Sequence, residues 1–204
     1  MPEENIIKFL KEENIEPIDD NNYGLGYRAA ATLKDGTYLP CVIFRSTGPI
    51  VKLASRRFKE EQAGRSIFGK KSGIGYWQIV KSFVANGNCV NHYDIAKIEK
   101  SKFAFRLRIQ NLIQGETSMS WTAFVATFKD GRKLGFGTTW NNEFFDVPEG
   151  YDVDDISEIT NHSYLLKTGE VVAHRSSFNR IVQKEEMEII YPDRQFFECY
   201  LDNL

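Results

Sequence analysis

The sequence has few cysteines: Cys41, Cys89 and Cys199 are the only three among its 204 residues, and they lie far apart. Their number is odd and no C-x-x-C pair occurs, so the spacing predicts neither a disulfide framework nor a zinc knuckle. Thiols without a disulfide pattern are typical of reducing compartments. We therefore expect a cytoplasmic protein.

Long apolar runs are lacking as well. No uninterrupted run is longer than Cys41–Phe44, which is far too short to cross a bilayer. The acidic stretch Met1–Asn5 has no long apolar segment behind it, so we expect neither a signal peptide nor contact with a membrane. The formal net charge is only −2, which gives no global field favouring nucleic acid or membrane.

The common catalytic motifs are missing too. No G-x-S-x-G, H-E-x-x-H or G-x-G-x-x-G pattern occurs, and the sequence identifies no cofactor. What the chain does have is 42% hydrophobic and 13% aromatic residues. This composition predicts a folded protein with a β-rich core, because aromatic rings suit pleated, half-buried surfaces.

Three segments predict the same kind of β-hairpin. Each is an apolar strand that runs into a Lys-Asp-Gly or Lys-Thr-Gly turn: Ala31–Gly36, Ala126–Gly131 and Tyr164–Gly169. Glycine supplies the positive φ that tight hairpin turns require. Such turns also arise by convergence, so their recurrence alone does not establish a duplicated domain.

Hairpins mixed with helical patterns predict an α+β fold. We expect a mostly antiparallel sheet, curved or partly closed, with flanking helices. The apolar spacing predicts helices at Ile6–Leu10, Pro49–Gly64, Phe178–Val182 and Phe196–Leu201, and a strand at Phe103–Ile109. The length suits a single α+β domain over residues 1–204. A glycine-bearing segment near 64–75 is either an internal boundary or a surface loop.

Charge is unevenly distributed along the chain. The segment Arg45–Lys81 holds nine basic residues against two acids, a net charge of +7, whereas Asn141–Thr160 holds seven acids and no base. The two segments pair with each other in the fold, or each meets a partner, or both are solvated faces. As contacts for an anionic partner we select Arg56, Arg57, Arg65, Lys70 and Lys71. The partner would be a protein, a nucleic acid or a phosphorylated ligand.

Catalytic candidates are dispersed along the chain. Imidazole and carboxylate groups are the usual general acids and bases, and we select His92, His174, Asp146 and Asp155. His92 lies close to Cys89 in sequence. Asn91, with Asp94 three residues later, also predicts the N-terminal cap of a helix that would contain Ile95 and Ile98. A three-residue turn at Lys167–Gly169 would place His162 opposite His174, where two imidazoles can share a metal ion.

Two functions remain open from the sequence. The first is a non-enzymatic binding or regulatory protein that contacts a macromolecular or anionic partner through charged patches. The second is a small hydrolase-like enzyme, metal-dependent or not, with a site assembled from dispersed His and Asp residues. The sequence fixes neither the partner nor the oligomeric state.

Overall fold

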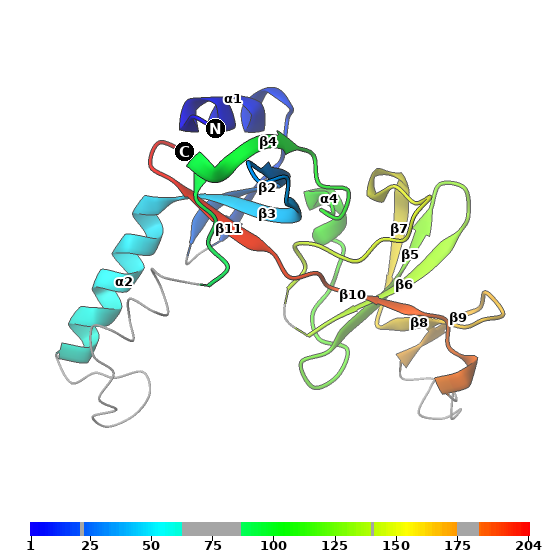
Figure 1. Ribbon diagram of the computed structural model, residues 1–204. Helices are drawn as coiled ribbons and strands as arrows, with labels where there is room; N and C mark the ends of the chain where they lie inside the picture. The colour runs from blue at the N-terminus through cyan, green and yellow to red at the C-terminus, as the bar shows by residue number, and fades with distance from the viewer. Residues whose placement is uncertain (21–22, 63–86, 140, 175–183) are drawn as a thin grey trace. The chain divides into compact units, whose positions relative to one another are not determined.

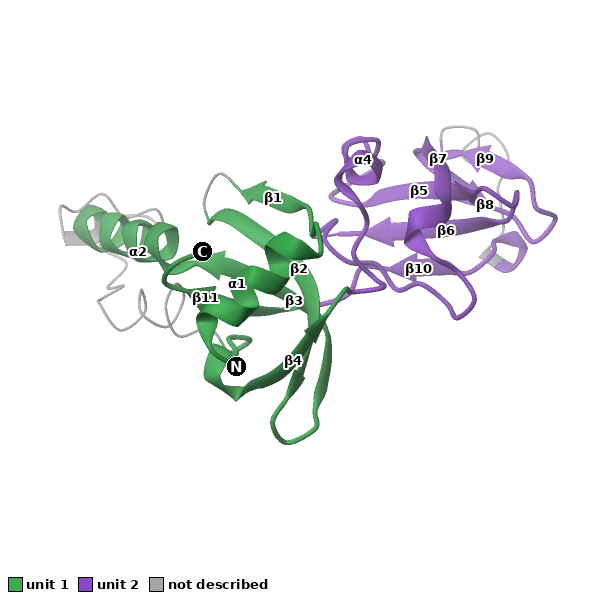
Figure 2. Cartoon of the chain, turned by 90° about the horizontal axis from the view of Figure 1, so that it is seen from above, with its two compact units in different colours: residues 1–100, 196–204 green, residues 101–195 purple. Residues whose placement is uncertain are grey.

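The structure is a computed structural model, and it describes residues 1–20, 23–62, 87–139, 141–174 and 184–204. These residues form two compact units, Met1–Lys100 with Phe196–Leu204, and Ser101–Gln195 (Figures 1 and 2). The boundary expected near 64–75 lies outside the described residues, and the single domain remains a prediction. No helix in the described ranges combines the length and the apolar character needed to span a bilayer.

The first unit is built on a five-stranded sheet in which β1 and β4 pair with opposite halves of β2. The order is β1-β2-β3-β11, with strands β1 (Pro17–Asp20), β2 (Gly24–Leu33), β3 (Tyr38–Ser46), β4 (Ile95–Glu99) and β11 (Phe197–Leu201). Helix α1 (Glu3–Glu12) buries Ile6 and Leu10 in a core with Val42 and Phe44, which confirms the first predicted helix. Helix α2 (Thr47–Gln62) confirms the second.

The second unit contains a four-stranded sheet and a separate hairpin. The sheet order is β10-β6-β5-β7, with β5 (Thr122–Phe128), β6 (Lys133–Thr138), β7 (Ile156–Asn161) and β10 (Ile190–Pro192). The hairpin is β8 (Ser163–Leu165) with β9 (Val171–Ala173), and a short helix α4 spans Leu107–Gln110. Phenylalanine rings fill the core, and those of Phe105 and Phe145 lie 4.8 Å apart.

All three predicted hairpins are confirmed, and all three turns have the same geometry. Gly36, Gly131 and Gly169 have φ of 89°, 85° and 84°. In each case the turn's glycine amide donates to the carbonyl of the last residue before the turn, at 2.8–3.0 Å. Since an L-residue side chain is strained at such φ values, glycine is the natural choice there.

The two units share one strand plan. In each, a hairpin is followed later in the chain by a 3-10 helix and a strand that pairs antiparallel with the first hairpin strand. In the first unit these are η1 (His92–Asp94) and β4, and in the second η2 (Val153–Asp155) and β7. In each, a final strand runs parallel to the second hairpin strand: β11 beside β3, and β10 beside β6. Part of this plan occurs a third time, where the hairpin β8–β9 is followed by the 3-10 helix η3 (Lys184–Glu186) and its turn is hydrogen-bonded to that helix.

Several expectations need correction. The α+β class is confirmed, but the two larger sheets are mixed rather than purely antiparallel, because β11 and β10 pair in parallel. The sheets are also open, not closed. The helix predicted at Phe196–Leu201 is wrong, because these residues form strand β11. Cys199 and Leu201 face the core, but Glu198, which lies between them and the start of the strand, is buried too, so the sequence lacks the alternation of apolar and polar residues that indicates a strand. Phe103–Ile109 is not a strand, because α4 begins at Leu107. Ile95 and Ile98 lie in strand β4, not in a helix. The helix expected at Phe178–Val182 lies outside the described residues.

Candidate functional site

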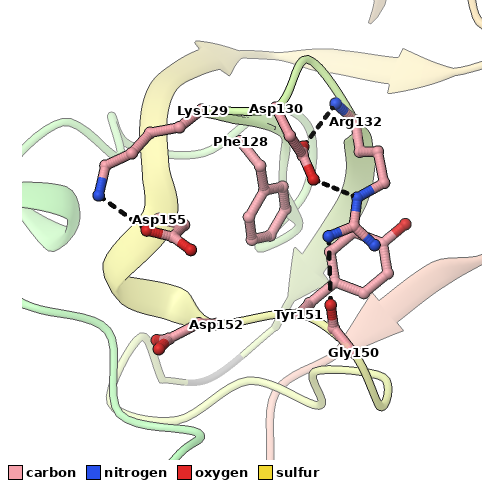
Figure 3. Close-up of a pocket in the computed structure, with 8 residues that line it drawn as sticks. All are labelled: Phe128, Lys129, Asp130, Arg132, Gly150, Tyr151, Asp152 and Asp155. Atoms are coloured by element: carbon pink, nitrogen blue, oxygen red, sulfur yellow. Dashed lines mark hydrogen bonds and ion pairs between the residues drawn. The ribbon is translucent and has the colours of Figure 1, made fainter.

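An open bowl lies beside the Lys-Asp-Gly turn of the second unit (Figure 3). Its volume is about 420 Å³, within the range of small-molecule sites. The hairpin β5–β6 and the segment leading into η2 supply its walls, with Phe128 between two groups of charged side chains. The lining residues are Phe128, Lys129, Asp130, Arg132, Gly150, Tyr151, Asp152 and Asp155.

Local backbone contacts hold the two walls together. The amide of Lys129 donates to the carbonyl of Asp155 at 2.9 Å, which fixes the turn against η2. The side chain of Asp152 caps η2 by accepting the amide of Asp154 at 2.8 Å. The bowl therefore depends on the turn and the 3-10 helix together.

Two ion pairs face each other across the bowl. On one side Lys129 Nζ lies 2.7 Å from Asp155 Oδ1. On the other, Arg132 Nε lies 2.5 Å from Asp130 Oδ2, and the guanidinium stacks 4.0 Å from the centre of the Tyr151 ring. The backbone amide of Arg132, and then its side chain, lower the pKa of Asp130 by hydrogen bonding. All four charged side chains are about half exposed, so these pairs exchange readily with water or a ligand.

A basic face runs along α2 in the first unit. Lys52, Arg56 and Lys59 are all exposed, and their spacing of four and three residues puts them on one side of the helix. Arg57 is half-buried and pairs with Glu60 at 3.2 Å. Arg65, Lys70 and Lys71 lie outside the described residues. Arg45 belongs to the same basic segment, but it is buried and pairs with Glu198 at 3.1 Å.

The catalytic candidates have separate partners. His92 lies in η1 of the first unit, with its ring edge-on to Tyr93. Asp146 pairs with Arg194 at 2.8 Å, and Asp155 pairs with Lys129. The hydroxyl of Tyr164 lies 3.2 Å from Nδ1 of His174. Their catalytic role stays a prediction.

The predicted alignment of the two histidines is confirmed at the backbone. Beyond the β8–β9 register, the amide of His174 donates to the carbonyl of His162 at 2.7 Å. The side chains have other partners, since His162 Nδ1 lies 3.1 Å from the hydroxyl of Thr117. Within the described ranges no group of three or more His, Cys, Asp or Glu residues is placed to hold a metal ion. A metal at His162 and His174 therefore lacks a third ligand among these residues.

Sequence reasoning missed the bowl residues Arg132, Tyr151 and Asp152. The available signal was the repeated Lys-Asp-Gly turn, but the 3-10 helix that meets it lies more than twenty residues away in the chain. Comparison of the chain with known protein families, with curated proteins and with solved structures found no match.

Proposed function

We propose that this chain is a non-enzymatic binding protein that contacts an anionic macromolecule through the exposed basic face of α2. The observation that carries the proposal is the row formed by Lys52, Arg56 and Lys59. Three cations at helical spacing form a stripe of positive charge about two turns long, which suits a regularly charged polyanion.

The acidic segment does not account for these cations. Its ion pairs among the described residues are made with bases of the second unit: Asp146 with Arg194, Asp154 with Arg106, and Asp155 with Lys129. Among the described residues, the acidic segment thus leaves the basic stripe to an external partner. Further bases follow α2 in sequence, at Arg65, Lys70 and Lys71. A cytoplasmic location belongs to the proposal, and the three cysteines, all in the described part of the chain, support it by remaining thiols.

The test is a charge reversal on α2 with a matched control on α1. We expect Arg56→Glu with Lys59→Glu to weaken binding of a fluorescent oligonucleotide by at least about tenfold at low salt. The control, Lys8→Glu with Lys11→Glu, changes the net charge equally on another helix and should leave binding nearly unchanged. Fluorescence anisotropy over a salt series measures both, because phosphate contacts give a steep salt dependence.

Single-stranded DNA, double-stranded DNA and a polyglutamate peptide serve as the three probes. Binding of polyglutamate alone would identify an acidic protein as the partner class. If none of the three binds, or if the α1 control weakens binding as much as the α2 variant, the proposal is wrong.

A further inference from the structure

Some bowl residues have counterparts of the same type at the corresponding positions of the first unit, and others do not. Lys129, Asp130 and Asp155 have counterparts of the same type in the first unit, Lys34, Asp35 and Asp94. Lys34 also donates its amide to the carbonyl of Asp94, at 2.8 Å. These three positions are therefore explained by the shared turn and 3-10 helix.

The other polar and aromatic positions differ between the units. Counted from the start of each 3-10 helix, Asp152 corresponds to Asn91 and Tyr151 to Val90; counted from each turn glycine, Arg132 corresponds to Thr37. The first unit forms the same hairpin and the same 3-10 helix without a tyrosine, an arginine or a second carboxylate at these places. Asp152 does cap η2, and Arg132 does donate to the carbonyl of Gly150 at 3.2 Å. The first unit forms its 3-10 helix with no side-chain cap from Asn91, so Tyr151, Asp152 and Arg132 go beyond what the shared scaffold requires.

The bowl has the composition of a site for an organic cation. Its charged residues are three carboxylates and two bases, and both bases already have anionic partners within it. Phe128 and Tyr151 meet edge to face at 5.0 Å and provide aromatic surface. Arg132 stacked on Tyr151 demonstrates that this ring accepts a cation at its face.

We propose that the bowl binds an alkylammonium group, held by the carboxylates of Asp152 and Asp155 and by the aromatic surface of Tyr151. In Figure 3 both carboxylates lie on one side of Phe128, and Tyr151 lies on the other. The group would come from a free polyamine or from a lysine side chain of a partner protein. An incoming ammonium would exchange with Lys129 at Asp155, which costs little because that ion pair is exposed.

Calorimetric titration of the full chain with spermidine and with Nα-acetyl-lysine methylamide tests the proposal. Asp155→Asn should weaken binding by about tenfold, while the matched variant Asp94→Asn, at the same place in the first unit, should not. Asp152→Asn should also weaken binding and still fold, because Asn91 occupies the corresponding position in the first unit. Selective binding of the lysine derivative would identify a protein partner, and selective binding of spermidine a polyamine.

Arg132→Thr should strengthen binding, whereas the substitutions of Asp152 and Asp155 should weaken it. The substitution installs the first unit's residue, uncovers the Tyr151 ring and makes the bowl more negative, so spermidine or lysine-derivative binding should become tighter. A generally destabilised protein would not bind more tightly. The proposal fails if neither probe binds the unmodified protein, or if Asp94→Asn weakens binding as much as Asp155→Asn. This outcome is independent of binding at α2.

Discussion

The backbone amide of Lys129 and the carbonyl oxygen of Asp155 are joined by a hydrogen bond of 2.9 Å, which ties the β5–β6 turn to η2. The same contact joins Lys34 to Asp94 at 2.8 Å and Lys167 to Glu186 at 3.0 Å. Each contact uses main-chain atoms only. The hydrogen bond therefore forms whatever side chains stand at these positions. The same scaffold can carry the bowl in the second unit, while the first unit has no counterpart of Arg132, Tyr151 and Asp152.

Removal of the Lys129 amide should loosen this junction. Proline suits the first turn position and lacks the N–H, so Lys129→Pro should lower the free energy of unfolding by about 1 kcal/mol. Lys129→Ala keeps the amide and should change stability by much less, since the ion pair with Asp155 and the hydrogen bond from Nζ to the Asp154 carbonyl, which it removes, are both exposed. Urea denaturation of the two variants measures the difference. Equal stabilities would mean that the amide contact contributes nothing.

Gly137 and Gly135 form a matched pair on β6. A Cβ on Gly137 would lie 2.2 Å from the Trp121 ring, whereas on Gly135 the nearest atom would be 3.6 Å away. Gly137→Ala should therefore cost about 1–3 kcal/mol of stability by overpacking, and Gly135→Ala considerably less. Thermal unfolding followed by tryptophan fluorescence compares them. A Gly135 variant as unstable as the Gly137 variant would contradict this contact.

Local chemistry explains which parts of the fold the sequence could predict. The three hairpins were predictable because each turn is determined by its own Lys-Asp-Gly or Lys-Thr-Gly residues. Strand β11 was not, because its backbone pairs with β3 more than 150 residues away and both of its faces hold buried residues. The stretch Asn91–Asp94 does form a helical turn, but it ends after one turn and continues as β4.

The same distinction applies to the sites. The basic face of α2 was predictable from spacing within a single helix. The bowl combines Arg132 of one segment with Tyr151 of another, and contacts between segments distant in sequence bring them together: the contact between turn and 3-10 helix, and the hydrogen bond from Arg132 to the Gly150 carbonyl. A pairing of this kind has no periodic signature in the sequence.

The buried ion pair between Arg45 and Glu198 should matter far more than an exposed one. Both side chains are less than one-tenth exposed, and Tyr200 donates its hydroxyl to Glu198 at 3.0 Å. Glu198→Gln would leave Arg45 charged and buried, with Asp20 3.8 Å away, and should cost about 3 kcal/mol. The control Glu99→Gln breaks the exposed Lys97–Glu99 pair and should cost less than about 1 kcal/mol. Chemical denaturation that gives similar losses for both would contradict the burial of this pair.

Stability should fall in alkaline solution because burial raises the pKa of Cys199 from 9.0 to about 12. The folded protein holds this proton more tightly than the unfolded chain does. The contribution is therefore complete below pH 9.0 and is lost as pH rises towards about 12. Each such proton changes the free energy of unfolding by about 1.4 kcal/mol per pH unit. Burial also raises the pKa of Tyr200 above its ordinary 10.0, which adds to the loss at higher pH.

Urea denaturation at a series of pH values from about 8 to about 9.5 measures the Cys199 contribution while most tyrosines of the unfolded chain are still protonated. Cys199→Ala provides the control. It should lower stability at every pH because it leaves a cavity in the α1-covered core, and it should also flatten the alkaline slope because the titrating thiol is gone. A slope that is unchanged in Cys199→Ala would assign the alkaline loss to other groups and would contradict a raised Cys199 pKa.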